Sequence, residues 1–198
     1  MDHVVVGVCG ASGVILGLKT IGALCRLGVC VDAIITHAAR TTAAEELTVS
    51  CQTDDEIRQF FPDIDQTLLS LHAIDNVGAP PASGTFVTRG MIIVPCSMAT
   101  LAAVSLGFCD NLLRRAADVT IKEGRRLLIV PREMPLSSIH LGHMLSLAQM
   151  GAIIMPPQPC WYQKPQSIGD VEDSIVARVL DRFGLSGAVQ RWSGVASV

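Results

Sequence analysis

Continuous apolar runs alternate with amphipathic segments along most of the chain. Residues 4–9 form an apolar run rich in β-branched side chains, and residues 29–35 form a second run that only Asp32 interrupts. Such runs predict strands that are buried on both faces of a sheet. Three shorter runs predict further strands at residues 91–94, 127–130 and 152–155.

Helical spacing of apolar positions fills the segments between these runs. Residues 13–27 carry apolar side chains at helical intervals, and Gly28 follows as a C-cap. The same reasoning predicts helices at residues 38–47, 97–106, 110–124, 136–150 and 170–183. The stretch 53–84 is mixed and partly proline-rich, and it predicts only a short helix at 54–60 followed by loop.

Strands that alternate with helices predict an α/β fold with a parallel sheet covered on both faces. The 198 residues are expected to form a single domain, 1–198. In sheets of this kind, ligands bind at the carboxyl ends of the strands. The residues that follow each strand are therefore the first candidates for a functional site.

Composition narrows the class of protein. Only 17% of the residues are charged and 49% are hydrophobic, which favours a homo-oligomer that covers part of its surface. A net charge of −3 excludes a nucleic-acid footprint, and no apolar run reaches the ~18 residues of a membrane span. The start of the chain lacks the basic region of a signal peptide. Seven scattered cysteines without a CxxC pair favour reduced thiols in a cytoplasmic protein over disulfides or a zinc site.

Hydroxyl groups follow the first three predicted strands, each at the start of a helix. They belong to Ser12 in the turn 10–13 (GASG), to Thr36, and to Ser97 with Thr100. Open N–H groups at a helix start suit a phosphate, so three such ends favour one anion bound by several helix termini. Simple N-capping is the alternative, and the GxGxxG fingerprint of dinucleotide sites is absent.

The later strand ends carry charged and aromatic side chains. Arg132 and Glu133 lie between two prolines, where a charge beside a buried strand needs a partner; a plain surface pair is the alternative. Trp161 and Tyr162 lie in a proline-rich loop, where their rings could pack against a planar ligand or fill space in the hydrophobic core. The remaining basic residues that are candidates for the site are Arg115, Lys122 and Arg178. Taken alone, each is interpreted as a solvated charge on a helix.

Five sequence segments, taken together, indicate a protein family more specifically than any single feature described above. They are GASG, PCSMATLAAVSLGFCDNLLRRAADV, KEGRRLLIVPREMPL, GAIIMPP and RVLDRFG, in that order. In combination they resemble the flavin prenyltransferase (UbiX-like) family, which includes the B subunits of hydroxyarylic acid decarboxylases. The resemblance spans essentially the whole chain and is weakest across residues 50–82.

The resemblance implies a Rossmann-like, flavodoxin-related three-layer sandwich and a trimer-based homo-oligomer, a dodecamer, with active sites between subunits. The C-terminal helix and tail, about 170–198, are expected to pack on a neighbouring subunit. The implied reaction joins the dimethylallyl group of dimethylallyl phosphate to N5 and C6 of reduced FMN. The product, prenylated FMN, serves a UbiD-type decarboxylase, and no metal is implied.

The resemblance also assigns roles to individual residues. The implied FMN-binding residues are Gly10, Ala11, Ser12, Thr36, Ser97, Met98, Ala99, Thr100 and Arg132. The implied ligands of the prenyl phosphate are Arg115, Lys122, Tyr162 and Arg178, with Trp161 facing the allyl group. The implied catalytic residues are Glu133 as acid–base, Ser12, Tyr162 and Glu46, for which the neighbouring Glu45 is the alternative register.

Some positions depart from the family pattern. Ala99 replaces the usual Lys, and Cys160 with Trp161 replaces a smaller Ala-Phe pair, which predicts a narrower pocket wall. The sequence therefore leaves open an FMN-binding carrier or accessory subunit without prenyl transfer. A flavin-dependent decarboxylase of the Cys-peptide type would need an early catalytic histidine, for which His37 is the candidate. A ligand-free α/β scaffold is the third alternative.

Overall fold

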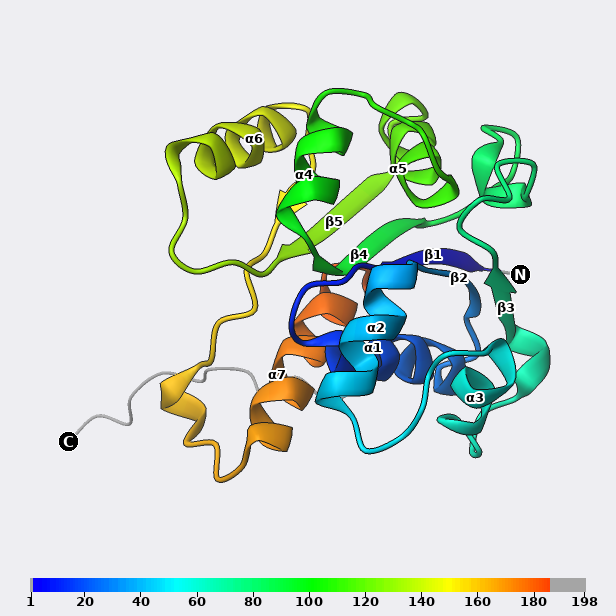
Figure 1. Ribbon diagram of the computed structural model, residues 1–198, viewed down its shortest axis with the longest axis vertical. Coiled ribbons are helices and arrows are strands. Elements are labelled where there is room, and N and C mark those ends of the chain that lie inside the picture. Colours follow the sequence, from blue (N-terminus) through cyan, green and yellow to red (C-terminus); the bar gives the residue numbers. More distant parts are fainter. Residues whose placement is uncertain (1, 186–198) are drawn as a thin grey trace.

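The computed structural model describes residues 2–185, and its framework is one parallel six-stranded sheet (Figure 1). The strand order is β3-β2-β1-β4-β5-β6, which is doubly wound with its switch point between β1 and β4. The strands are β1 (His3–Val8), β2 (Cys30–Ile35), β3 (Leu69–His72), β4 (Gly90–Cys96), β5 (Arg126–Pro131) and β6 (Ile153–Ile154).

Helices cover both faces of the sheet (Figure 1). One layer holds α1 (Val14–Arg26), α2 (His37–Glu46), α3 (Asp54–Gln59) and α7 (Ile168–Asp181). The other layer holds α4 (Met98–Ser105), α5 (Leu112–Lys122) and α6 (Ser138–Gln149). The predicted α/β class and three-layer sandwich are confirmed.

Two hydrophobic clusters fill the spaces between the layers. Val4, Val6 and Val8 of β1 point into the cluster beneath α1 and α7, whereas Val5 points into the cluster beneath α4 and α5. Successive side chains of a strand point to opposite faces, so a strand buried on both faces needs an unbroken apolar run. This requirement explains why the central strands were predictable.

The edge strand β3 lies in the stretch 53–84 that was predicted to be loop after its short helix, so that part of the prediction is wrong. β3 pairs in parallel with β2, and only Leu69 of its four residues is buried. A four-residue strand with one neighbour and one buried side chain gives almost no periodic signal. Its position is set by the partner strand rather than by its own sequence.

A buried carboxylate ties this edge to the middle of the sheet. Asp32 of β2 is 4% exposed. Its two oxygens lie 2.8 Å from Nδ1 of His3, at the start of β1, and 2.8 Å from Nε2 of His72, at the end of β3. The sequence reasoning gave Asp32 no role, although a carboxylate this deeply buried requires polar partners.

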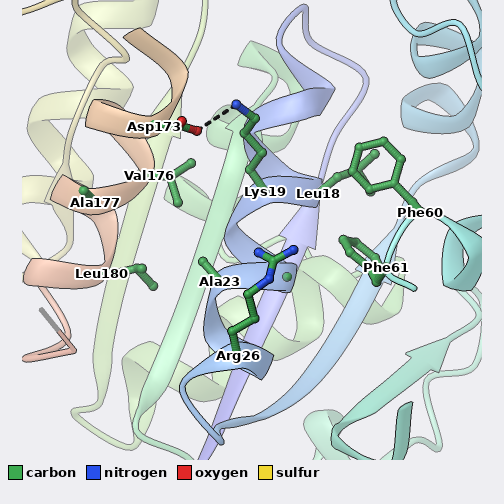
Figure 2. Close-up of a pocket in the computed structure, with 11 residues that line it drawn as sticks. Leu18, Lys19, Ala23, Arg26, Phe60, Phe61, Asp173, Val176, Ala177 and Leu180 are labelled. Atoms are coloured by element: carbon green, nitrogen blue, oxygen red, sulfur yellow. Dashed lines mark hydrogen bonds and ion pairs between the residues drawn. The ribbon is translucent and has the colours of Figure 1, made fainter. Parts of the chain in front are cut away.

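The C-terminal helix packs along α1 of its own chain. Figure 2 shows Lys19 of α1 reaching Asp173 of α7, at 2.7 Å, across one end of an apolar groove of about 380 Å³. α7 begins two residues before its predicted start because Ser167 and Asp170 form a capping box. The expected packing of the C-terminal region on a neighbouring subunit stays a prediction, and residues 186–198 lie outside the described part.

Two findings bear on the class of protein. Among residues 2–185, no helix combines the length and the apolar character that crossing a bilayer requires. All seven cysteines are free thiols, and five of them are buried. The cytoplasmic location that the cysteine usage predicted remains a prediction.

The bridge at Asp32 generates a stability prediction. Asp32→Ala leaves two half-buried imidazoles without their shared acceptor, so the free energy of unfolding should fall by about 2–3 kcal/mol, measured by urea denaturation. The matched control is Asp63→Ala, which removes an exposed partner of Arg26 and should change stability little. Equal losses in the two variants would show that the Asp32 bridge has no special structural role.

Candidate functional site

The carboxyl ends of the strands are joined to one another by backbone hydrogen bonds. The Cys9 N–H donates to the Pro95 carbonyl at 3.1 Å, and the Thr36 N–H donates to the Val8 carbonyl at 3.0 Å. The Arg132 N–H donates to the Cys96 carbonyl at 3.2 Å. These bonds link the loops after β1, β2, β4 and β5. The structure therefore brings together four of the segments that the sequence singled out.

The turn after β1 is pressed against the start of α2. A Cβ atom on Gly10 would lie 2.5 Å from the Ala38 Cβ and 2.7 Å from its carbonyl carbon. No other residue fits without moving backbone, because real Cβ contacts are not this short. Glycine at this position keeps the turn free of a side chain where it meets the neighbouring loop.

The start of α1 is capped by a carboxylate from α2. Glu46 accepts hydrogen bonds from the Gly13 N–H at 3.0 Å and the Val14 N–H at 3.1 Å. The prediction that these N–H groups stay open for a phosphate is therefore wrong. Ser12 does not cap the helix either, and its exposed hydroxyl bonds no other residue that the structure describes. The contact distinguishes Glu46 from Glu45, which makes no such bond within residues 2–185.

Two of the predicted hydroxyls do act as N-caps. The Thr36 side chain accepts from the Ala39 N–H at 3.0 Å, and the Ser97 side chain accepts from the Thr100 N–H at 3.3 Å. The Ser97 hydroxyl also lies 3.2 Å from the Thr100 hydroxyl. Met98 is half-buried and Ala99 is exposed on the first turn of α4. Capping occupies part of the bonding capacity of each hydroxyl and leaves the rest for a ligand.

Two buried thiols lie directly beneath these loops, and the sequence reasoning gave them no role. Cys9 follows β1 and Cys96 ends β4. A hydrogen bond from the Cys96 thiol lowers the pKa of Cys9 to about 7 against the opposing effect of burial, and Thr100 adds to the lowering. Burial, followed by the contact with Cys9, raises the pKa of Cys96 well above its ordinary value. Their places at two adjacent strand ends were the available signal.

Arg132 and Glu133 border a cavity of about 460 Å³ between two proline-rich loops. Its walls are residues 131–136, Met144 and residues 156–159. Both charged residues are exposed, and the Glu133 carboxylate accepts from the Met134 N–H at 3.1 Å. No ion pair joins the two side chains, so the surface-pair alternative does not hold among the described residues.

A smaller cavity of about 170 Å³ adjoins the first and shares Pro156 and Gln158 with it. Arg178 of α7 and Cys160 line this second cavity. The Arg178 guanidinium lies 3.3 Å from Asp181 and is about half exposed. Tyr162 and Trp161 are 53% and 77% exposed, and Trp161 lines neither cavity. Of the two residues that were expected to narrow the pocket wall, only Cys160 lines a cavity within one chain, and the narrowing itself stays a prediction.

Arg115 and Lys122 are not brought to this edge within a single chain. On α5, Arg115 donates to the Ala82 carbonyl at 3.2 Å and pairs with Asp118 at 2.7 Å, while Lys122 pairs with Glu123. Figure 1 shows α5 beside the segment that leads into β4, at the other end of the strands from these cavities. Neither cation lines either of the two cavities of the single chain.

Comparisons with known proteins agree with this architecture. The family model described as Flavoprotein matches residues 1–180. The flavin prenyltransferase UbiX of Chlamydia trachomatis serovar D is 44% identical over 196 residues, covering 97% of this chain and 98% of the relative. A dodecameric FMN-dependent UbiX-like decarboxylase from Escherichia coli O157:H7 has a TM-score of 0.88 and 40% identity, covering 97% and 100%. AnUbiX in complex with FMN and dimethylallyl pyrophosphate has a TM-score of 0.90 and 42% identity, covering 98% and 99%.

The cap on α1 generates a prediction with a neighbouring control. Glu46→Ala should lower the free energy of unfolding by about 1 kcal/mol, because two N–H groups at the helix start lose their acceptor and the helix dipole loses a compensating charge. Glu45→Ala should change it by far less. Urea denaturation of both variants measures the difference, and a larger loss for Glu45→Ala would contradict the assignment.

Proposed function

This chain belongs to the Flavoprotein family and, within it, to the UbiX flavin prenyltransferases, and we propose that it joins a dimethylallyl group to N5 and C6 of reduced FMN. The observation that carries the proposal is the meeting of four strand-end loops beside a cavity that Arg132 and Glu133 line. The proposed donor is dimethylallyl phosphate. AnUbiX, with its bound FMN and dimethylallyl pyrophosphate, supports both ligands.

The residues at the strand ends suit FMN. Arg132 has no ion pair with any described residue, so its charge remains available for a phosphate. Hydroxyls of Ser12, Thr36 and Ser97 add donors at three helix starts. Gly10 lets the turn after β1 lie directly against Ala38, which keeps the turn close to the hydroxyl at the start of α2. Thr100, Met98 and Ala99 continue this surface on α4.

The smaller cavity is proposed to hold the prenyl phosphate. Arg178 is the cation that lines it, and Tyr162 lies in the short 3-10 helix Trp161–Gln163 that follows Cys160. Charge on the phosphate oxygens grows as the bond to the allyl carbon breaks, and a fixed guanidinium stabilises that charge most strongly at this stage. Because the two cavities share Pro156 and Gln158, a donor bound beside Arg178 lies next to Glu133.

The chemistry is divided among few groups. Bound reduced FMN supplies the nucleophilic atoms. Glu133 donates a proton to the departing phosphate oxygen and takes up the proton that N5 loses on alkylation. At ring closure it delivers that proton to the double bond of the allyl group and accepts the proton lost from C6. Ser12 orients the ring, and Glu46 acts by holding the turn that carries Ser12. Trp161, exposed in one chain, shields the allyl group in the assembled protein.

Assembly of several copies completes the proposed site. Ile139, Leu141 and Leu145 of α6 are each more than half exposed, and Met134 is 86% exposed, which favours burial against another copy. Arg115 and Lys122 of one copy then serve the donor cavity of its neighbour. The dodecameric relative from E. coli supports a trimer-based dodecamer. The proposed recipient of prenylated FMN is a UbiD-type decarboxylase.

The reaction itself is tested by flavin mass. Anaerobic incubation with reduced FMN and dimethylallyl phosphate should yield a flavin that is heavier by one five-carbon unit, detected by mass spectrometry after extraction. Oxidised FMN in place of reduced FMN is the matched control and should gain nothing. A flavin of unchanged mass on folded, FMN-loaded protein would replace the proposal with the carrier alternative.

Removing the proposed acid–base group should slow the reaction and spare binding. Glu133→Gln should reduce the rate of prenyl transfer about 100-fold or more, with FMN affinity unchanged, because the amide cannot donate or accept the proton. Glu45→Gln, on the exposed face of α2, is the control for loss of one carboxylate. Wild-type turnover by Glu133→Gln would remove Glu133 from the mechanism.

Mixed oligomers test the contribution of α5 across subunits. Arg178→Met and Lys122→Met should each abolish prenyl transfer, since each removes a phosphate ligand. Co-expression in equal amounts should restore about a quarter of the sites, those that combine Arg178 from one variant with Lys122 from the other. No recovery in co-purified mixed oligomers would mean that both cations act within one chain, and full activity of Lys122→Met by itself would mean that Lys122 has no role.

A further inference from the structure

The two cavities at the strand ends meet at a wall that consists of Pro156 and Gln158. Among the described residues, these two line both cavities. Pro156 has no N–H, and its carbonyl already accepts the Gln158 N–H at 2.9 Å. The side-chain amide of Gln158 is therefore the hydrogen-bond donor that this junction wall offers to a ligand, and the mechanism above does not use it.

The backbone on both sides of Gln158 is restrained. The Met155 N–H donates to the Ile129 carbonyl at 2.8 Å, which ties the start of the loop to β5. Pro157 and Pro159 flank Gln158, and each proline ring fixes its own φ angle. A residue that precedes proline is itself restricted to extended conformations. The loop therefore sets the place of the Gln158 backbone, and only its side chain is left to adjust to a ligand.

The amide of Gln158 is not committed to another group of the protein. Its side chain is exposed and makes no hydrogen bond with any other residue that the structure describes. By contrast, the Ser174 hydroxyl, which also lines the smaller cavity, donates its proton to the Val171 carbonyl at 2.9 Å. Both N–H bonds of the Gln158 amide thus remain available to a ligand.

The junction wall lies where the bond to the allyl carbon breaks. Arg178 lines the cavity that holds the phosphate, and Glu133 lines the cavity beside the flavin loops, so a donor that spans both has its carbon–oxygen bond at the wall. When this bond breaks, its electron pair stays on the phosphate oxygen and the freed carbon bonds to the flavin nitrogen. A hydrogen bond to an oxygen that gains charge strengthens as the bond breaks, so it stabilises the transition state more than the bound donor.

We propose that Gln158 is a catalytic residue whose side-chain amide donates a hydrogen bond to the phosphate oxygen from which the dimethylallyl group departs. The inference rests on the proposed function, since it takes the smaller cavity as the site of the prenyl phosphate. Glu133 protonates the same oxygen, which has lone pairs for both groups once the bond to carbon is broken. The proline-rich loop then supplies a chemical group to the reaction as well as a wall.

The first test is kinetic. Gln158→Leu keeps the approximate size of the side chain and removes the donor, so kcat should fall about tenfold or more, the loss of one hydrogen bond to a charged group. KM for dimethylallyl phosphate should change by about twofold at most, because the bond matters little before charge develops. Gln158→Glu keeps the shape but places an anion at the wall, so it should lower kcat and also raise KM. Gln59→Leu on α3 is the matched control, since Gln59 lines neither cavity, and it should keep both wild-type constants.

The second test measures binding without prenyl transfer. Inorganic phosphate carries the charge that the departing oxygen acquires, so its dissociation constant from the FMN-loaded protein should rise about tenfold in Gln158→Leu. Calorimetry measures this constant, and Gln59→Leu should keep the wild-type value. The FMN affinity and the urea midpoint of Gln158→Leu should equal those of the wild type, because the amide has no partner among the described residues. A distorted loop would change these last two quantities, whereas a lost hydrogen bond to phosphate would not.

Two results would overturn the role of Gln158: a wild-type kcat in Gln158→Leu, or a lower kcat with an unchanged affinity for inorganic phosphate. Either result, obtained while the wild-type protein forms prenylated FMN, removes Gln158 from the mechanism and leaves the proposed function in place. A wild-type protein that binds FMN but yields flavin of unchanged mass overturns the proposed function, and the role of Gln158 falls with it.

Discussion

The hydrogen bonds between neighbouring strand ends are the constraint on which the site depends. A parallel sheet brings the carboxyl ends of its strands to one edge, but loops leaving that edge are free to diverge. Here the Cys9 N–H is hydrogen-bonded to the Pro95 carbonyl, and the Arg132 N–H is hydrogen-bonded to the Cys96 carbonyl. The loops therefore begin as a single hydrogen-bonded unit. The positions of the functional side chains on these loops therefore depend on main-chain hydrogen bonds, whose donors and acceptors no side-chain substitution removes.

Side chains then fix the direction of each loop. Glu46 draws the end of α2 to the start of α1, and Gly10 allows the turn between them to sit against Ala38. A carboxylate that serves as an internal anion at a helix start does the work that a bound phosphate does in other proteins. The phosphate of a ligand must therefore use other donors. Arg132 and the hydroxyls at the starts of α2 and α4 are the groups left for it.

The sequence predicts best what depends on burial. The strands β1, β2, β4 and β5 lie between two helix layers, so their apolar runs are continuous and readable. β3 has only one strand neighbour and one buried residue, and its pairing is dictated by β2. The candidate residues at the strand ends were found because a parallel sheet gathers them. The roles of Asp32, Cys9 and Glu46 as hydrogen-bonding partners needed coordinates, since each contacts residues far away in the sequence.

The sheet ends at both sides in very short strands, four residues in β3 and two in β6. An unpaired strand edge is the usual template for adding a strand from another molecule, and its capacity grows with its length. Edges this short leave too few main-chain groups to hold a second sheet in register. Association of copies through side chains is therefore favoured over pairing of strand edges. Growth into an open fibre by sheet extension is thereby disfavoured, while closed shells of packed helices remain accessible.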